Sequence, residues 1–154
     1  MNHQLVRTYA RLTDCEQSTW KRFATGALFV AVVAIGAAIV NLIVYAIASS
    51  LGAVSESVDL VGTAGLSAGL IAVTTGIGIA LAASTLALVG WLSRRPVRTF
   101  RIVATVALAL SFLPVLSLPG APASMKLTLL SMHIVAWAAS ISLLPSLAHA
   151  PDRS

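Results

Sequence analysis

Residues 23–50 read FATGALFVAVVAIGAAIVNLIVYAIASS, a run that contains no Asp, Glu, Lys or Arg. A helix that crosses the hydrocarbon core of a bilayer, about 30 Å thick, needs roughly 20 such residues. The run therefore predicts a membrane-spanning helix. The apolar run of a cleaved signal peptide is shorter, usually about 7–15 residues, so we expect this helix to be retained in the mature protein.

Three further stretches are long and apolar enough to span a bilayer, at about 66–92, 97–118 and 124–147. Of the 154 residues, 58% are hydrophobic and only 10% are charged, whereas ordinary globular domains carry about 25% charged residues. A soluble domain of this size leaves too much surface in water to hide so much apolar area. The composition excludes a soluble protein, a disordered chain and an ordinary nucleic-acid binder. It predicts an all-α integral membrane protein, a bundle of four transmembrane helices.

The basic residues indicate the orientation of the bundle, because Lys and Arg accumulate in cytoplasmic loops. They lie before the first span, between the second and third spans, and after the fourth: Arg7, Arg11, Lys21, Arg22, Arg94, Arg95, Arg98, Arg101 and Arg153. Only Lys126 lies near the other two connections, 51–65 and 119–123. We therefore predict that both termini are cytoplasmic, in a bacterial plasma membrane. Segment 1–22 is either a short helix on the membrane surface or a partly ordered tail, and 148–154 is a cytoplasmic tail.

Small residues recur at four-residue spacing in the second span. The stripe comprises Ala72, Gly76, Ala80 and Ser84, preceded by Gly65 and Gly69. Small side chains let the backbone of a neighbouring helix approach closely. We interpret the stripe as a contact between helices of the same chain, and the alternative is a contact with a second copy or with another membrane protein.

Polar side chains inside a bilayer are costly, and a charge at its centre costs at least about 2.5–3.5 kcal/mol. The few that occur are therefore candidates for function. His133 lies near the middle of the fourth span and is a candidate acid or base. Asn41 and Tyr45 lie one turn apart on one face of the first span. Their structural alternatives are a hydrogen-bonded histidine, an interhelical amide and an interface aromatic.

Glu56 and Asp59 are the only acidic residues outside the two tails. If the apolar segment 51–65 folds back onto the bundle, a carboxyl group there would have a raised pKa and could exchange protons near neutrality. Otherwise they are two solvated loop acids. Together with further residues, most of them polar and in the same outer half, they complete a predicted site. Its catalytic residues are Glu56, Asp59 and His133, and its substrate-binding residues are Asn41, Tyr45, Thr74, Ser111 and Trp137.

We expect no metal and no cofactor. The single cysteine, Cys15, excludes a dithiol mechanism, and one intramembrane histidine without cysteine partners does not favour a metal site.

Three short motifs resemble a family of small actinobacterial four-helix membrane proteins of uncharacterised function. They are Ser131–Ala136 (SMHIVA), Arg98–Arg101 (RTFR) and Ala38–Leu42 (AIVNL). The resemblance covers most of 23–147. It implies the four-helix architecture and draws attention to Asn41 and His133, but it implies no activity.

Three functions remain open at this point. The first is binding or conversion of a hydrophobic, isoprenoid- or polyketide-like molecule by acid/base chemistry, such as isomerisation, cyclisation or epoxide opening. The second is a non-catalytic membrane subunit or lipid-binding component of a larger assembly. The third is a small transporter. The expected partners are membrane lipids, a hydrophobic ligand, and a second copy or another membrane protein, with no nucleic acid.

Overall fold

The computed structural model describes the backbone of residues 3–54 and 66–149, and the side chains of residues 20–21, 23–54 and 66–147. Within these ranges the chain forms α1 (His3–Ser50), α2 (Ala68–Leu92), α3 (Pro96–Leu116), α4 (Ala123–Leu143) and the 3-10 helix η1 (Leu144–His149). The described residues contain four helical segments long and apolar enough to cross a membrane: Phe23–Ser50, Ala68–Leu92, Pro96–Leu116 and Ala123–Leu147. The prediction of an all-α chain with four helices of spanning length is confirmed.

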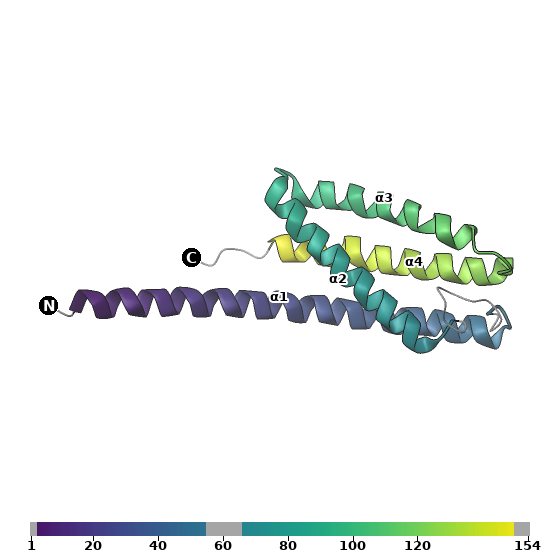
Figure 1. The fold of residues 1–154 in the computed structure, drawn as a ribbon, viewed down its shortest axis with the longest axis horizontal. Helices are drawn as coiled ribbons and strands as arrows, with labels where there is room; N and C mark the ends of the chain where they lie inside the picture. Colours follow the sequence, from purple (N-terminus) through teal and green to yellow (C-terminus); the bar gives the residue numbers. More distant parts are fainter. Residues whose placement is uncertain (1–2, 55–65, 150–154) are drawn as a thin grey trace.

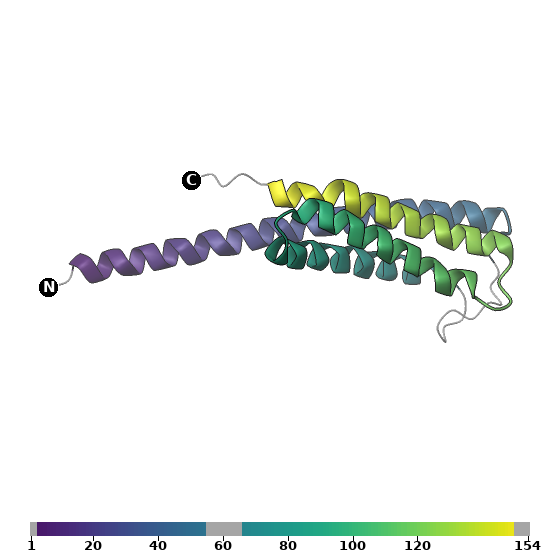
Figure 2. The ribbon, with the colours of Figure 1, turned by 90° about the horizontal axis from the view of Figure 1, so that it is seen from above.

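The helices α1 and α4 differ most from the predicted segments. α1 is continuous over 48 residues, which corresponds to a length of about 72 Å, so segment 1–22 joins the first span without a break from His3 onward. The beginning of α1 extends well beyond the other helices (Figures 1 and 2). α4 ends at Leu143, and the chain continues as η1, because Pro145 lacks the N–H group that another α-helical turn requires.

The C-terminus of α1 is closed by a glycine in the left-handed region. Gly52 has a φ of 68°, a conformation that costs a residue with a Cβ atom free energy. The N–H of Ala53 donates to the carbonyl of Ala48 at 2.8 Å, and the N–H of Gly52 donates to the carbonyl of Ser49 at 3.0 Å. These two hydrogen bonds form a Schellman motif, which ends the helix and satisfies two of its last carbonyl groups.

The other connections are also stabilised locally. α3 begins with Pro96 at its first position, where the missing N–H has no intrahelical partner to lose. The hydroxyl of Ser93, in the turn before α3, is hydrogen-bonded to the hydroxyl of Thr99, in the first turn of α3, at 2.9 Å. At the other end of α3, the Lys126 ammonium donates to the carbonyl of Leu116 at 2.8 Å. A cation there complements the negative end of the helix dipole.

The four helices form one bundle in which α1 packs against α2 and α4, and α3 packs against α2 and α4. We call the end that holds residues 51–54 and 117–122 the loop end, and the opposite end, with the 93–95 turn and η1, the turn end (Figures 1 and 2). This arrangement places the two basic regions at 20–22 and 94–101 on the side of the turn end.

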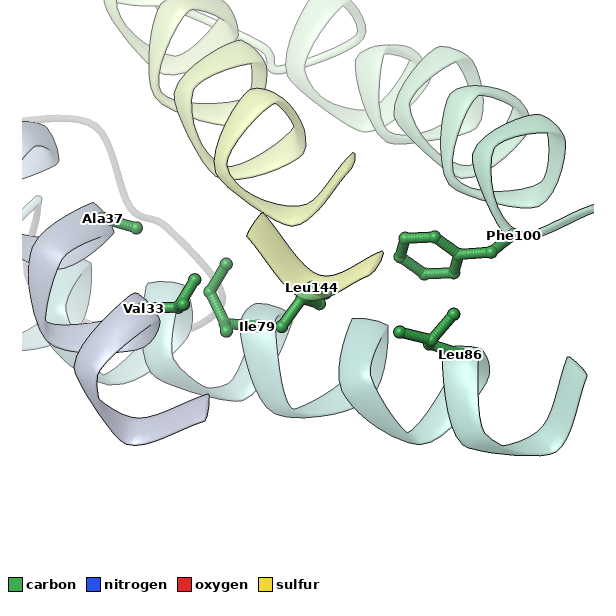
Figure 3. Close-up of a cluster of buried hydrophobic side chains, with 6 residues drawn as sticks. All are labelled: Val33, Ala37, Ile79, Leu86, Phe100 and Leu144. Atoms are coloured by element: carbon green, nitrogen blue, oxygen red, sulfur yellow. The ribbon is translucent and has the colours of Figure 1, made fainter. Parts of the chain in front are cut away.

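The apolar core runs from the middle of the bundle to the turn end. Its buried side chains point toward one another from α1, α2, α3 and η1: Val33, Ala37, Ile79, Leu86, Phe100 and Leu144 (Figure 3). Ile79 and Leu144 are 0% exposed. The buried polar residues Asn41, Thr75 and Thr128 lie outside this cluster, toward the loop end.

The stripe of small residues on α2 does not make the predicted contact. A Cβ atom added at Gly69 or Gly76 would meet nothing within 4 Å in the described part of the chain. The buried face of α2 is instead formed by Ile71, Thr75, Ile79 and Leu86. Within the described residues, the predicted contact is therefore not made at these two glycines, of which Gly69 is exposed and Gly76 half-buried.

Candidate functional site

A pocket of about 430 Å³ lies between the helices in the loop-end half of the bundle. Each of the four helices contributes to its wall, and most of the wall is apolar: Leu70, Ile71, Val115, Leu118, Leu129 and Met132. Asn41, Thr74, Thr75 and His133 are the polar residues that line it. A mostly apolar cavity with a few convergent polar groups is the usual form of a small-molecule site.

Asn41 is the most deeply buried polar residue of the pocket, with only 2% of its surface exposed. Its Nδ2 donates a hydrogen bond to Oγ1 of Thr75, on α2, at 3.0 Å. Its Oδ1 is buried and has no hydrogen-bond partner among the described residues. Buried polar atoms are nearly always hydrogen-bonded in native proteins, so this oxygen marks a position where a partner is expected.

His133 enters the pocket from α4, and its tautomer follows from its hydrogen bond. Nδ1 lies 2.7 Å from the carbonyl oxygen of Leu129. A carbonyl only accepts, so Nδ1 carries the proton. In the neutral ring Nε2 is then an acceptor, and it is the nitrogen that can take a proton from a ligand or bind its hydroxyl group.

The two threonines present hydroxyl groups that differ in their partners. Thr74 donates to the carbonyl of Leu70 at 2.7 Å, which commits its hydrogen and leaves its oxygen as an acceptor. Thr75 is buried and accepts from Asn41. Thr75 is not among the predicted site residues. Adjacent helical residues point about 100° apart, and the sequence does not show which of the two threonines faces the other helices.

Tyr45 lies beside the pocket without lining it. Its hydroxyl donates to the carbonyl of Leu66 at 3.1 Å, and Leu66 belongs to the wall. Tyr45 is therefore placed to hold the segment before α2 against α1, one turn beyond Asn41.

The structure brings Asn41, Thr74 and His133 to one pocket, but not the other predicted residues that it describes. Ser111 donates to the carbonyl of Leu108 within α3. Trp137 is one turn beyond His133, and its Nε1 donates to Oγ1 of Thr105 at 3.3 Å. Neither lines the pocket. The predicted catalytic residues Glu56 and Asp59 lie outside the described residues, so their roles stay predictions.

The family model of the DUF6069 family, described as a family of unknown function, matches residues 18–150. The chain belongs to this family. The match agrees with the predicted kinship to a family of uncharacterised function, and an actinobacterial origin stays a prediction. No curated protein and no solved structure matches the chain.

In this DUF6069 member, the match covers the four segments of spanning length and every residue that lines the pocket. Among the described side chains there is no carboxylate, and they hold no group of three or more His, Cys, Asp and Glu side chains that could hold a metal ion. The chemistry of the pocket wall thus rests on one imidazole, one amide and hydroxyl groups. These groups can bind and orient a neutral molecule, and His133 can accept a proton from it.

Proposed function

We propose that this protein is a multi-pass protein of a bacterial plasma membrane, with both termini in the cytoplasm, that binds a hydrophobic small molecule in the four-helix pocket. The four spanning-length helices and the basic residues at the turn end support the membrane orientation. The observation that carries the binding proposal is Oδ1 of Asn41, which is buried without a partner among the described residues and belongs to a side chain that lines a mostly apolar pocket.

The proposal extends to acid/base conversion of an isoprenoid- or polyketide-like ligand. Neutral His133 would accept a proton through Nε2, and Glu56 or Asp59 would supply one if segment 51–65 approaches the pocket. A pocket with water largely excluded favours isomerisation, cyclisation or epoxide opening, because reactive intermediates are protected there from side reactions. If His133→Ala, Glu56→Gln and Asp59→Asn all leave turnover of a verified substrate intact, this catalytic assignment is wrong.

Two glycines on α2 allow a matched test of binding. Gly78 lines the pocket, Gly76 does not, and a Cβ atom at either position would meet nothing within 4 Å. A Cβ atom therefore has room at both positions, but only the side chain of Gly78→Leu would extend from the wall of the pocket. The wild-type protein and both variants would be released from lipid nanodiscs into a native mass spectrometer, and co-purifying molecules would be extracted and identified.

We expect a discrete non-lipid ligand on the wild-type protein and on Gly76→Leu, and its loss in Gly78→Leu. A wild-type protein that carries only bulk lipid, or equal ligand on Gly78→Leu, would contradict the proposal.

The open face at Gly69 and Gly76 favours a second candidate function, that of a non-catalytic subunit of a membrane assembly. Small residues on an uncovered helix face permit close contact with another helix. Under this proposal Gly76→Leu abolishes co-purification of a partner protein, whereas Gly78→Leu does not. The same pair of variants therefore separates the two candidate functions.

A further inference from the structure

The hydrogen-bonding groups of the pocket wall define the polar group of its ligand. At Asn41, one N–H is committed to Thr75, while Oδ1 has no partner within the described residues. A buried amide oxygen without a hydrogen-bond partner is unfavourable, so a ligand that donates a hydrogen bond to it gains more than a ligand that only accepts. The second N–H of the same amide can in turn donate to the ligand's oxygen.

Two other groups of the pocket wall are hydrogen-bond acceptors, like this oxygen. The Nδ1 proton of His133 is taken by the carbonyl of Leu129, so Nε2 of the neutral ring is an acceptor. The hydroxyl proton of Thr74 is taken by the carbonyl of Leu70, so its oxygen is an acceptor as well. The wall therefore presents acceptors from three different helices, without a charged group among its lining residues.

The size of the pocket limits the apolar part of the ligand. An apolar cavity of about 150 Å³ holds one benzene ring, which has six carbon atoms. A pocket of about 430 Å³ is about three times larger, so it suits a molecule of roughly 17 non-hydrogen atoms. A hydroxyl group is the smallest group that both donates to Oδ1 and accepts from the amide N–H.

We infer that the pocket selects a neutral aliphatic alcohol of about 15 carbon atoms, the size of a sesquiterpenoid, whose hydroxyl donates to Oδ1 of Asn41. This inference rests on the proposed function and names the ligand class for the same pocket. Asn41 is the residue that determines specificity, and the apolar residues of α2, α3 and α4 hold the hydrocarbon chain. Sites built to bond a hydroxyl group strongly reject analogues that lack the donor.

The test compares farnesol with farnesyl methyl ether, which have the same chain and differ in the hydrogen-bond donor. Protein in nanodiscs would bind tritiated farnesol in a scintillation proximity assay, and both compounds would compete unlabelled. Protein-free nanodiscs of identical lipid composition measure partition into lipid, and the specific signal is the difference from them. We expect the ether to compete about tenfold more weakly than farnesol on the wild-type protein, and the preference to disappear in Asn41→Leu.

The outcomes separate this inference from the proposed function. Equal competition by the alcohol and the ether, with specific binding still lost in Gly78→Leu, would overturn the alcohol inference and leave hydrophobic binding in place. A preference for the ether would overturn it too, since the amide would then present its N–H groups. No specific binding of either compound would overturn the alcohol inference, and the mass spectrometry of the wild-type protein would then decide the proposed function on its own. The comparison on the wild-type protein does not depend on any variant being able to fold.

Discussion

Nδ2 of Asn41 on α1 donates a hydrogen bond to Oγ1 of Thr75 on α2 at 3.0 Å, and both residues are buried. The contact joins residues 34 positions apart in the sequence. Side-chain hydrogen bonds between helices in a membrane contribute only about 0.6 kcal/mol on average, so this bond alone does not explain a buried amide. Asn41 lines the pocket, and Oδ1 of the same amide is buried without a partner among the described residues, which is a feature of a binding site more than of a stabilising contact.

Replacing either partner of this hydrogen bond by an apolar residue should affect stability, but to different extents. Asn41→Leu removes the bond together with the unpaired oxygen, so we expect an unchanged or higher melting temperature. Thr75→Val leaves the whole amide unpaired, and we expect a loss of about 1–3 kcal/mol. Thermal unfolding of the detergent-solubilised variants measures both. A larger loss in Asn41→Leu than in Thr75→Val would show that Oδ1 is bonded in the native protein, outside the described residues.

The face that α2 turns toward the bundle predicts that two alanine substitutions on this helix differ in their effect on stability. Ile79 is 0% exposed and belongs to the apolar core, whereas Leu81 is 63% exposed and lies on the opposite side of the helix. Ile79→Ala should cost about 2–5 kcal/mol because it opens a cavity, while Leu81→Ala should change stability by less than about 0.5 kcal/mol. The same unfolding experiment measures both variants. The reverse order would mean that α2 presents its other face to the bundle.

Two glycines with different backbone conformations should respond oppositely to alanine. Gly52, with its φ of 68°, holds the Schellman motif, so Gly52→Ala should destabilise the protein by about 1–2 kcal/mol. Gly76 is helical and has open space around its Cβ position, so Gly76→Ala should stabilise the helix, by up to about 1 kcal/mol. An unchanged or higher melting temperature of Gly52→Ala would disprove the capping role of Gly52.

The proposed orientation is testable with the natural cysteine. Cys15 precedes the first span, so a membrane-impermeant maleimide should label it only after the cells are opened. In the background of Cys15→Ser, the variant Ser117→Cys places the thiol at the loop end, where intact cells should be labelled directly. If intact cells label Cys15 and not the cysteine at position 117, the orientation is the opposite of the one that we propose.

Several features of the fold are predictable from the sequence because they depend on neighbouring residues alone. The length and apolar character of each run decide whether a helix of spanning length forms. Pro96 and Pro145 mark the start of α3 and the end of α4, since a residue without an N–H group is best tolerated in the first turn of a helix. Pro114, by contrast, lies inside α3, close to its end at Leu116. The depth of a residue such as His133 follows from the fixed rise of 1.5 Å per residue.

The face that each helix turns inward is decided only by the tertiary structure. α2 is apolar around its whole circumference, so its sequence does not distinguish the buried face of Ile71 and Thr75 from the open face of Gly69 and Gly76. The sequence does not determine the directions of the polar side chains either. Trp137 donates a hydrogen bond to Thr105 of α3 instead of lining the pocket.

The sequence by itself thus determined four long apolar helices, the ends of several of them and the half of the bundle in which the polar residues lie. Each of these properties is local, because it follows from residues close together in the chain. Only the tertiary structure decided that Asn41, Thr74 and His133 meet at one pocket with Thr75. That convergence depends on how apolar surfaces of four separate helices fit together, and packing between distant segments leaves no pattern within any one of them.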